Sequence, residues 1–183
     1  MYYRLTSDNE NFRNYRLPKR LSSLESVKLS ESFDGRSHKD GYKTINFEMT
    51  LDSEKEYPIA DFQESHVPFC SENAKKVIEA ISDENEIEFL PCNLEGTEEQ
   101  YYILNVLGLE DCVDYDKSKF TRFPSTGRIM FFEHIEFNKE VDRHFFRIKD
   151  LPYAHYFVSQ EAKDKLEQAN LKGLVFSNKL FKK

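Results

Sequence analysis

The sequence predicts an α+β fold, with a mostly antiparallel sheet and two principal helices packed on it. Two observations predict it. Residues 72–81 and 160–169 show the spacing of amphipathic helices, and residues 87–94 and 100–107 are β-rich runs on either side of a polar turn. A chain of 183 residues with 39% hydrophobic residues is long enough to bury a core without disulfides or metals. We therefore expect residues 1–183 to form a single domain.

The helix at residues 72–81 has clear local signals. Ser71 is a favourable N-cap, and Glu72 adds an acidic residue to the first turn. The apolar stripe of this helix consists of Ala74, Val77, Ile78 and Ile81. The segment that begins at Ser159 carries Ser, Ala, Lys and Glu at the same offsets as the segment that begins at Ser71. This similarity between the two segments fits a duplicated strand, helix and strand unit, and it equally fits the general pattern of a capped helix.

Strand patterns account for much of the remaining chain. The runs at 87–94 and 100–107 flank residues 95–99 and should pair as an antiparallel hairpin. Further strands are expected at residues 1–6, 42–49, 128–137, 144–148 and 171–176. A further helix is indicated at residues 11–28, and the polar stretch 30–41 is expected to be a surface loop.

Three pairs of adjacent aromatic residues stand within these predicted strands. They are Tyr101–Tyr102, Phe131–Phe132 and Phe145–Phe146. Neighbouring residues of a strand point to opposite faces, so each pair should place one ring on each face of its sheet. The second ring either packs under helices or forms an exposed hydrophobic anchor for a partner.

Cysteine usage and hydropathy bear on the compartment. The three cysteines are widely spaced and form no CxxC pair, which favours a reducing environment. Residues 1–8 show no basic region leading into an apolar one, as a secretory signal requires. No stretch reaches the roughly 18 to 20 apolar residues of a membrane helix. We expect a soluble, cytoplasmic protein with no membrane partner.

The net charge of −7 is unevenly distributed along the chain. Residues 83–116 contain eleven acidic residues and no basic one. Such a segment repels phosphate backbones, so a basic protein is a better candidate partner than nucleic acid. The candidate partner-binding residues are Glu95, Glu98, Glu99, Glu110, Asp111, Asp114 and Asp116. The alternative is a solvated face that only keeps the protein soluble.

Motifs for catalysis and nucleotide binding are missing from the sequence. No G-x-S-x-G elbow is present, and no two of the six glycines lie within five residues of each other, which excludes a P-loop and a dinucleotide turn. Asp61 is an acidic residue in the mostly apolar run 58–62, where a hydrogen-bonded structural role is the expected one. We therefore expect no catalytic residues and no cofactor.

Two partial metal motifs also fail. Residues 114–118 have the D-x-D-x-S opening of a calcium loop, but Lys119 and Ser125 stand where that loop needs glycine and glutamate. An Asx-type turn is the better interpretation. His66 and Cys70 have a ligand-like spacing, yet Pro68 separates them and no second pair follows. We expect no metal site.

Several short motifs follow one another in a recognisable order. They are Ile59–Phe62, Ser71–Glu72, Phe89–Pro91, Tyr101–Val106, Val113–Asp114, Ser118, Phe146–Ile148, Val158–Ser159 and Gly173–Leu174. This succession resembles the immunity proteins of bacterial polymorphic toxin systems, specifically the eleventh immunity-protein family, long known as a domain of unknown function. The resemblance covers residues 57–177 and leaves residues 1–56 outside the motifs.

The resemblance implies a cytoplasmic protein that is encoded beside a toxin, binds that toxin and blocks it without an enzymatic step. It also implies that the motif positions mostly determine the fold, whereas toxin contacts vary between members. Those motif positions are Asp61, Ser71, Pro91, Tyr102, Asn105, Asp114 and Ser118. The residues themselves leave three other classes open. One is a small-molecule-binding or regulatory sensing domain with an aromatic-lined pocket, the second is an enzyme with dispersed carboxylates, and the third is a structural or oligomer-forming role.

Overall fold

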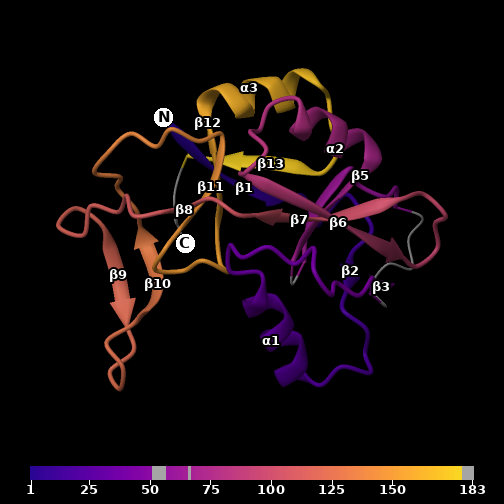
Figure 1. Cartoon of the computed structure of the whole chain (residues 1–183), viewed down its shortest axis with the longest axis horizontal. Coiled ribbons are helices and arrows are strands. Elements are labelled where there is room, and N and C mark those ends of the chain that lie inside the picture. Colours follow the sequence, from indigo (N-terminus) through magenta and orange to yellow (C-terminus); the bar gives the residue numbers. More distant parts are fainter. Residues whose placement is uncertain (51–56, 66, 179–183) are drawn as a thin grey trace.

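The computed structural model describes residues 1–50, 57–65 and 67–178, and Figure 1 shows its elements. Its strands form a five-stranded sheet, a six-stranded sheet and a separate hairpin. The five-stranded sheet has the order β13 (Leu174–Ser177), β1 (Tyr2–Ser7), β12 (Tyr156–Ser159), β11 (Phe145–Ile148), β8 (Leu109–Glu110). The six-stranded sheet has the order β2 (Tyr15–Arg16), β3 (Ile45–Met49), β6 (Ile87–Leu94), β7 (Tyr101–Val106), β5 (Pro68–Ser71), β4 (Phe62–Glu64). The hairpin consists of β9 (Lys119–Arg122) and β10 (Ile129–His134).

The fold is α+β, but the expected arrangement of the sheets needs correction. Both large sheets are mixed, because β3 pairs with β6 in parallel and β8 pairs with β11 in parallel, whereas the other described ladders are antiparallel. Two parallel neighbours are connected by a long crossover and not by a tight turn, so no local hairpin signal in the sequence predicts their pairing. The division of the strands between two sheets depends on the same long-range pairing.

Three helices are present in the described chain, rather than two principal ones. They are α1 (Ser23–Ser32), α2 (Glu72–Glu79) and α3 (Gln160–Gln168). The last two begin where the sequence predicts, because the Ser71 and Ser159 hydroxyls accept the backbone N–H groups of Ala74 and Ala162. Among the described helices, none has the length and apolar character needed to cross a membrane.

The helix expected at residues 11–28 is not found at that position. Tyr15–Arg16 forms a strand, and α1 begins only after Ser22. Ser22 and Glu25 form a capping box, in which each side chain bonds the backbone N–H of the other. This strong start signal overrides the leucine spacing behind Pro18. The helix has no buried residue and projects from the body of the molecule (Figure 1).

The predicted strands vary in accuracy. The one at residues 87–94 matches β6, and its antiparallel pairing with β7 confirms the predicted hairpin. The strands expected at residues 1–6, 42–49, 128–137, 144–148 and 171–176 are present as β1, β3, β10, β11 and β13 with shifted ends. Besides β2, five short strands of two to four residues have no counterpart in the prediction, namely β4, β5, β8, β9 and β12. Strands this short carry too little alternation to be read from sequence.

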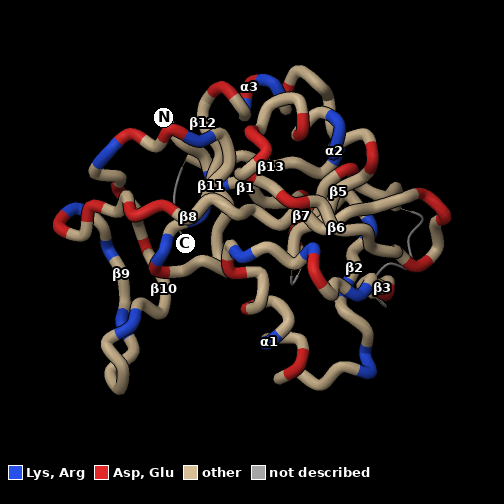
Figure 2. Tube along the Cα trace, in the orientation of Figure 1, with Lys and Arg blue, Asp and Glu red and all other residues tan. Residues whose placement is uncertain are grey.

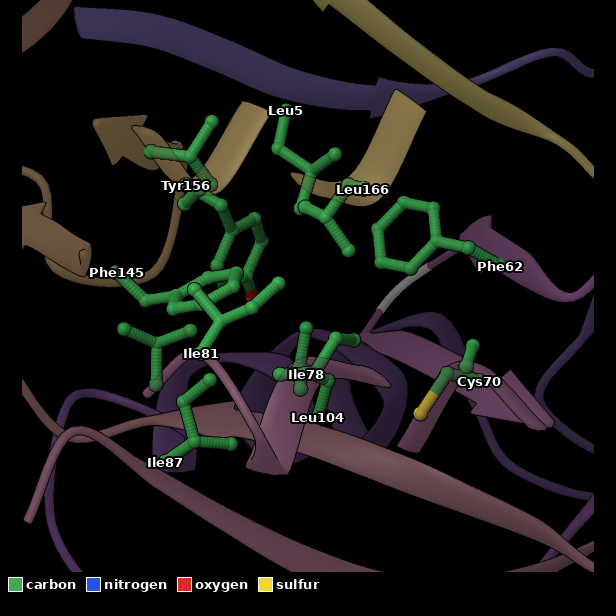
Figure 3. Packing of buried hydrophobic residues seen from close by; sticks show 14 residues of the cluster. Leu5, Phe62, Cys70, Ile78, Ile81, Ile87, Leu104, Phe145, Tyr156 and Leu166 are labelled. Atoms are coloured by element: carbon green, nitrogen blue, oxygen red, sulfur yellow. The ribbon is translucent and has the colours of Figure 1, made fainter. Parts of the chain in front are cut away.

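One hydrophobic cluster lies between the two large sheets and helices α2 and α3 (Figure 3). Leu5, Phe62, Leu104 and Tyr156 are among its buried members. The helices add Ala74, Ile78, Ala162 and Leu166. A second cluster lies under α1 and β3, and a third lies between β11 and the base of the β9–β10 hairpin. Phe145 and Phe146 are both buried, because β11 separates the first and third clusters.

The two large sheets contain the same unit. In one, β4, β5, α2 and β6 follow each other along the chain, and in the other β11, β12, α3 and β13 do so. The spatial orders β4–β5–β7–β6 and β11–β12–β1–β13 are antiparallel throughout. Strand β1 therefore occupies the place in one sheet that β7 occupies in the other.

Individual contacts repeat between the two units. Leu104 in β7 and Leu5 in β1 hold equivalent positions in the pairing registers, and both are buried in the shared cluster. The ammonium of Lys75 lies 4.4 Å from the centre of the Tyr102 ring, and the ammonium of Lys163 lies 5.2 Å from the centre of the Tyr3 ring. These repeated contacts support the duplication that the similarity between the Ser71 and Ser159 segments suggested.

Candidate partner-binding surface

A groove of about 430 Å³ opens at the N-terminal end of α3. It is formed by the start of β1, the loop between α2 and β6, the segment before β11, and the first turn of α3. Its lining residues are Met1, Tyr2, Asp83, Glu86, Glu140, Val141, Asp142, Arg143, His144, Ser159, Gln160 and Glu161. We call this feature the acidic groove, because five of the lining side chains are carboxylates.

Hydrogen bonds hold the floor of the acidic groove in place. The Glu86 carboxylate accepts the backbone N–H of His144 at 2.9 Å and that of Phe145 at 3.3 Å. Burial raises the pKa of Glu86, while these two N–H groups act in the opposite direction. The His144 ring lies 2.9 Å from the Ser159 hydroxyl, which also caps α3. Glu86 therefore serves the structure of the groove rather than its open surface.

The wall and rim of the groove are also anchored. The Tyr2 hydroxyl accepts the backbone N–H of Val141 at 2.6 Å, which ties β1 to the segment before β11. Arg143 donates to Glu110 at 3.0 Å, so part of its charge is already compensated. The exposed carboxylates of Glu140 and Asp142 lie at the rim, together with that of Glu161, which accepts a hydrogen bond from the Lys165 ammonium at 2.7 Å. A rim of this kind attracts cationic side chains more strongly than anions.

The seven carboxylates predicted as partner-binding residues do not lie together. Glu95, Glu98 and Glu99 lie at the β6–β7 turn, whereas Glu110, Asp111, Asp114 and Asp116 lie in and after β8. These two segments stand at opposite ends of the long axis, as Figures 1 and 2 show. The two groups therefore form two separate acidic areas.

Ion pairs compensate several charges of the group in and after β8. Besides its bond to Arg143, Glu110 lies 3.6 Å from the ammonium of Lys139. Asp111 lies 3.8 Å from Lys149, and Asp114 lies 2.8 Å from Lys117. By contrast, Glu98 and Glu99 are exposed at their turn.

The partial calcium motif is an Asx-type turn. The Asp114 carboxylate accepts the backbone N–H groups of Asp116 and Lys117, each at 3.2 Å. Its pKa is lowered, mainly because the Lys117 side chain donates a hydrogen bond to it. Within the described residues, no group of three or more His, Cys, Asp or Glu side chains is arranged to hold a metal ion. His66 lies outside the described residues.

Asp61 joins the two large sheets. Its carboxylate accepts the Ser71 hydroxyl at 2.7 Å and the backbone N–H of Lys172 at 2.9 Å. The carbonyl of Lys172 in turn accepts the backbone N–H groups of Asp61 and Phe62. Gly173 follows with a φ of +87°, and a side chain there would collide with the Phe62 carbonyl.

Asn105 lies in a buried network between the two sheets. Its amide nitrogen donates to Glu88 at 3.0 Å and to the Arg36 carbonyl at 2.8 Å. Its amide oxygen accepts from the fully buried guanidinium of Arg147 at 3.1 Å. Arg147 also donates to the carbonyls of Phe33 and Pro152. The network therefore joins β6, β7 and β11 to the segment that follows α1.

The remaining motif residues have less buried partners. The Pro91 carbonyl accepts the Tyr42 hydroxyl at 2.9 Å. The Ser118 hydroxyl accepts the backbone N–H of Glu136 at 2.9 Å. Tyr102 packs under the ammonium of Lys75, as described above. Each of these contacts connects different segments of the fold.

Sequence reasoning missed the carboxylates at the rim of the acidic groove. Glu140, Asp142 and Glu161 belong to a part of the chain where basic residues outnumber acidic ones. Only Asp83 and Glu86 come from the acidic segment 83–116. Counting charges along the chain therefore does not find the groove, because the fold assembles it from four distant segments.

Comparison with known families agrees with the motif resemblance. The chain matches the immunity protein family Imm11 over residues 7–179. No curated protein matches the chain. The family match begins well before residue 57, so it includes most of the segment that the short motifs left out. Because the match spans nearly the whole chain, the protein belongs to the Imm11 immunity protein family.

Proposed function

We propose that this protein is a non-catalytic immunity protein that acts in the cytoplasm by binding and neutralising a cognate bacterial toxin through the acidic groove. Family membership points to immunity against a toxin. The observation that favours this particular surface is the set of four exposed carboxylates, those of Asp83, Glu140, Asp142 and Glu161, around one open groove of about 430 Å³. A groove of this size is large enough to admit side chains of a partner.

Charge complementarity favours a basic area on the toxin. The rim carboxylates Glu140, Asp142 and Glu161 are exposed, and the nearby Arg143 is engaged by Glu110. Lysine or arginine side chains of a toxin are attracted to such a rim, and the attraction speeds the encounter of the two proteins. The rim repels phosphates, so nucleic acid is not the proposed ligand.

The acidic turn formed by Glu95, Glu98 and Glu99 is the competing surface. It lies at the other end of the molecule, so a toxin that contacts the groove through a compact interface does not reach the turn. The two acidic areas can therefore be tested by variants that carry equal charge changes at separate places.

The first experiment identifies the toxin. The tagged protein is recovered from its native cells, and a stoichiometric partner encoded beside it is tested for toxicity alone and together with this protein. Titration of the toxin's activity then separates binding from catalysis. A binder abolishes the activity at an equimolar ratio, whereas an enzyme that modifies the toxin acts at far lower ratios.

The second experiment locates the surface. Glu140, Asp142 and Glu161 are replaced together by lysine, and a matched variant carries lysine at Glu95, Glu98 and Glu99. We expect the groove variant to bind the toxin at least about tenfold more weakly and with a smaller dependence on salt, because exposed interfacial charges mainly affect association. The turn variant should bind like the wild type. The reverse result would move the interface to the turn, and unchanged binding by both variants would remove the acidic-surface proposal.

A further inference from the structure

The β9–β10 hairpin stands apart from both large sheets. Within the described chain its two strands pair with each other and with no other strand. Figure 1 shows the hairpin projecting from the body of the molecule. An isolated hairpin of two strands is only marginally stable in water, so its stability depends on what its faces contact.

One face of the hairpin packs on the body. Ile129 and Phe132 are 5% and 1% exposed and belong to the third hydrophobic cluster, and Phe120 packs against it. At the base, the Ser118 hydroxyl accepts the backbone N–H of Glu136, and a β-bridge joins Val113 to Phe137. The hairpin is therefore held in one orientation before any partner arrives.

The other face and the tip expose apolar side chains. Phe131 is 44% exposed, Phe123 at the tip is 42% exposed, and Met130 is 39% exposed. Phe131 is the outward ring of the pair whose inward ring is Phe132. Aromatic and methionine side chains that a fold presents in this way are enriched at the centres of protein interfaces.

The hairpin is also basic, unlike the chain as a whole. Residues 117–132 contain four basic residues and no acidic one, in a chain of net charge −7. The Arg122 guanidinium lies 4.7 Å from the centre of the Phe120 ring and donates to the Gly127 carbonyl at 2.8 Å. These two contacts hold the positive charge of Arg122 beside the apolar tip. Arg128 and Lys119 are exposed on the same hairpin.

We propose that this hairpin is the hydrophobic anchor of the toxin interface and enters an apolar pocket whose rim carries carboxylates. The proposal rests on the proposed immunity function. The exposed apolar groups fit the pocket, and the cations of Arg122, Arg128 and Lys119 fit its acidic rim. The hairpin and segment 140–143, which lines the acidic groove, lie at the same end of the molecule (Figure 1). Two contacts of opposite charge at one end admit a toxin in one orientation only, which gives specificity.

The test compares two exposed apolar sites. One variant carries Met130→Ser and Phe131→Ser, and the matched control carries Leu24→Ser and Val27→Ser on α1, where the side chains are 62% and 49% exposed. Binding to the toxin identified as described above is measured by calorimetry, and thermal unfolding is recorded for both variants. We expect the hairpin variant to bind about 10 to 100 times more weakly with an unchanged melting temperature, and the α1 variant to bind like the wild type.

Charge reversal supplies an independent readout. Arg122→Glu together with Arg128→Glu should slow association with the toxin, and added salt should reduce the difference from the wild type. If the wild type binds the toxin and both hairpin variants bind it equally well, the hairpin proposal is overturned while the immunity proposal stands. If the hairpin substitutions instead convert a dimer to a monomer without changing toxin binding, the hairpin serves a second copy of this chain and the proposal is also overturned. If no toxin binds the wild type, the immunity proposal itself fails.

Discussion

Replacing Asn105 by alanine should destabilise the protein strongly, because this residue links the two sheets. The side chain is fully buried and makes three hydrogen bonds, two of them to the charged groups of Glu88 and Arg147. A bond to a charged group contributes about 1.5 to 3 kcal/mol, and the bond to the Arg36 carbonyl contributes about 1 kcal/mol. Water that enters the vacated space recovers part of this sum. We therefore expect Asn105→Ala to lower the free energy of unfolding by about 4 kcal/mol.

Urea unfolding followed by circular dichroism measures this loss, and Asn46→Ala is the matched control. Asn46 also lies in a strand and accepts one side-chain hydrogen bond, from Asn93 at 2.7 Å, but both residues are exposed. The control should lose less than about 1 kcal/mol. A loss at Asn105 no larger than that of the control would refute the reasoning, because it would mean that the buried charges of Arg147 and Glu88 do not depend on the amide between them.

Three further predictions concern titration, thiol reactivity and the N-terminal strand. Burial lowers the pKa of His155 to about 3, so the unfolded chain binds a proton below about pH 6.5 that the folded protein does not. The free energy of unfolding should fall as the pH drops from 6.5 towards 3, by about 2 kcal/mol at pH 5. Urea titrations at pH 6.5 and at pH 5 measure this fall, and the His155→Gln variant should not show it. Cys70, Cys92 and Cys112 are buried, and burial raises the pKa of each thiol, so a disulfide reagent should label them only after denaturation. Labelling of the native protein at the rate of a free thiol would contradict this. Deleting residues 1–7 removes β1, an inner strand paired on both sides, and should abolish cooperative unfolding, which calorimetry detects.

Elements that depend on short-range sequence signals were predicted correctly. Helices α2 and α3 begin where Ser71 and Ser159 supply an N-cap before an apolar stripe, and the β6–β7 hairpin follows from two runs around a short polar turn. The mixed sheets and the acidic groove were not predictable in this way. Both depend on which distant segments meet, and charge or alternation along the chain does not determine that.

Two of the motif residues that carried the family resemblance make long-range contacts. Asp61 bonds the turn before β13, and Asn105 bonds a strand of the other sheet through Arg147. The motif residues do not locate the proposed partner-binding surfaces, because the rim of the acidic groove and the tip of the hairpin are formed by other residues.

The repeated unit shows why the inner strand of the second unit could not be recognised from the sequence. The similarity between the Ser71 and Ser159 segments is local and visible, but each unit also needs a strand between its second and third strands. In the first unit this strand, β7, follows directly, whereas the second unit takes β1 from the opposite end of the chain. Tyr2–Tyr3 and Leu5 then stand where Tyr101–Tyr102 and Leu104 stand in the first unit. Because β1 completes the second sheet from the N-terminus, the two halves of the chain cannot be separated at a single point without leaving one sheet without its inner strand.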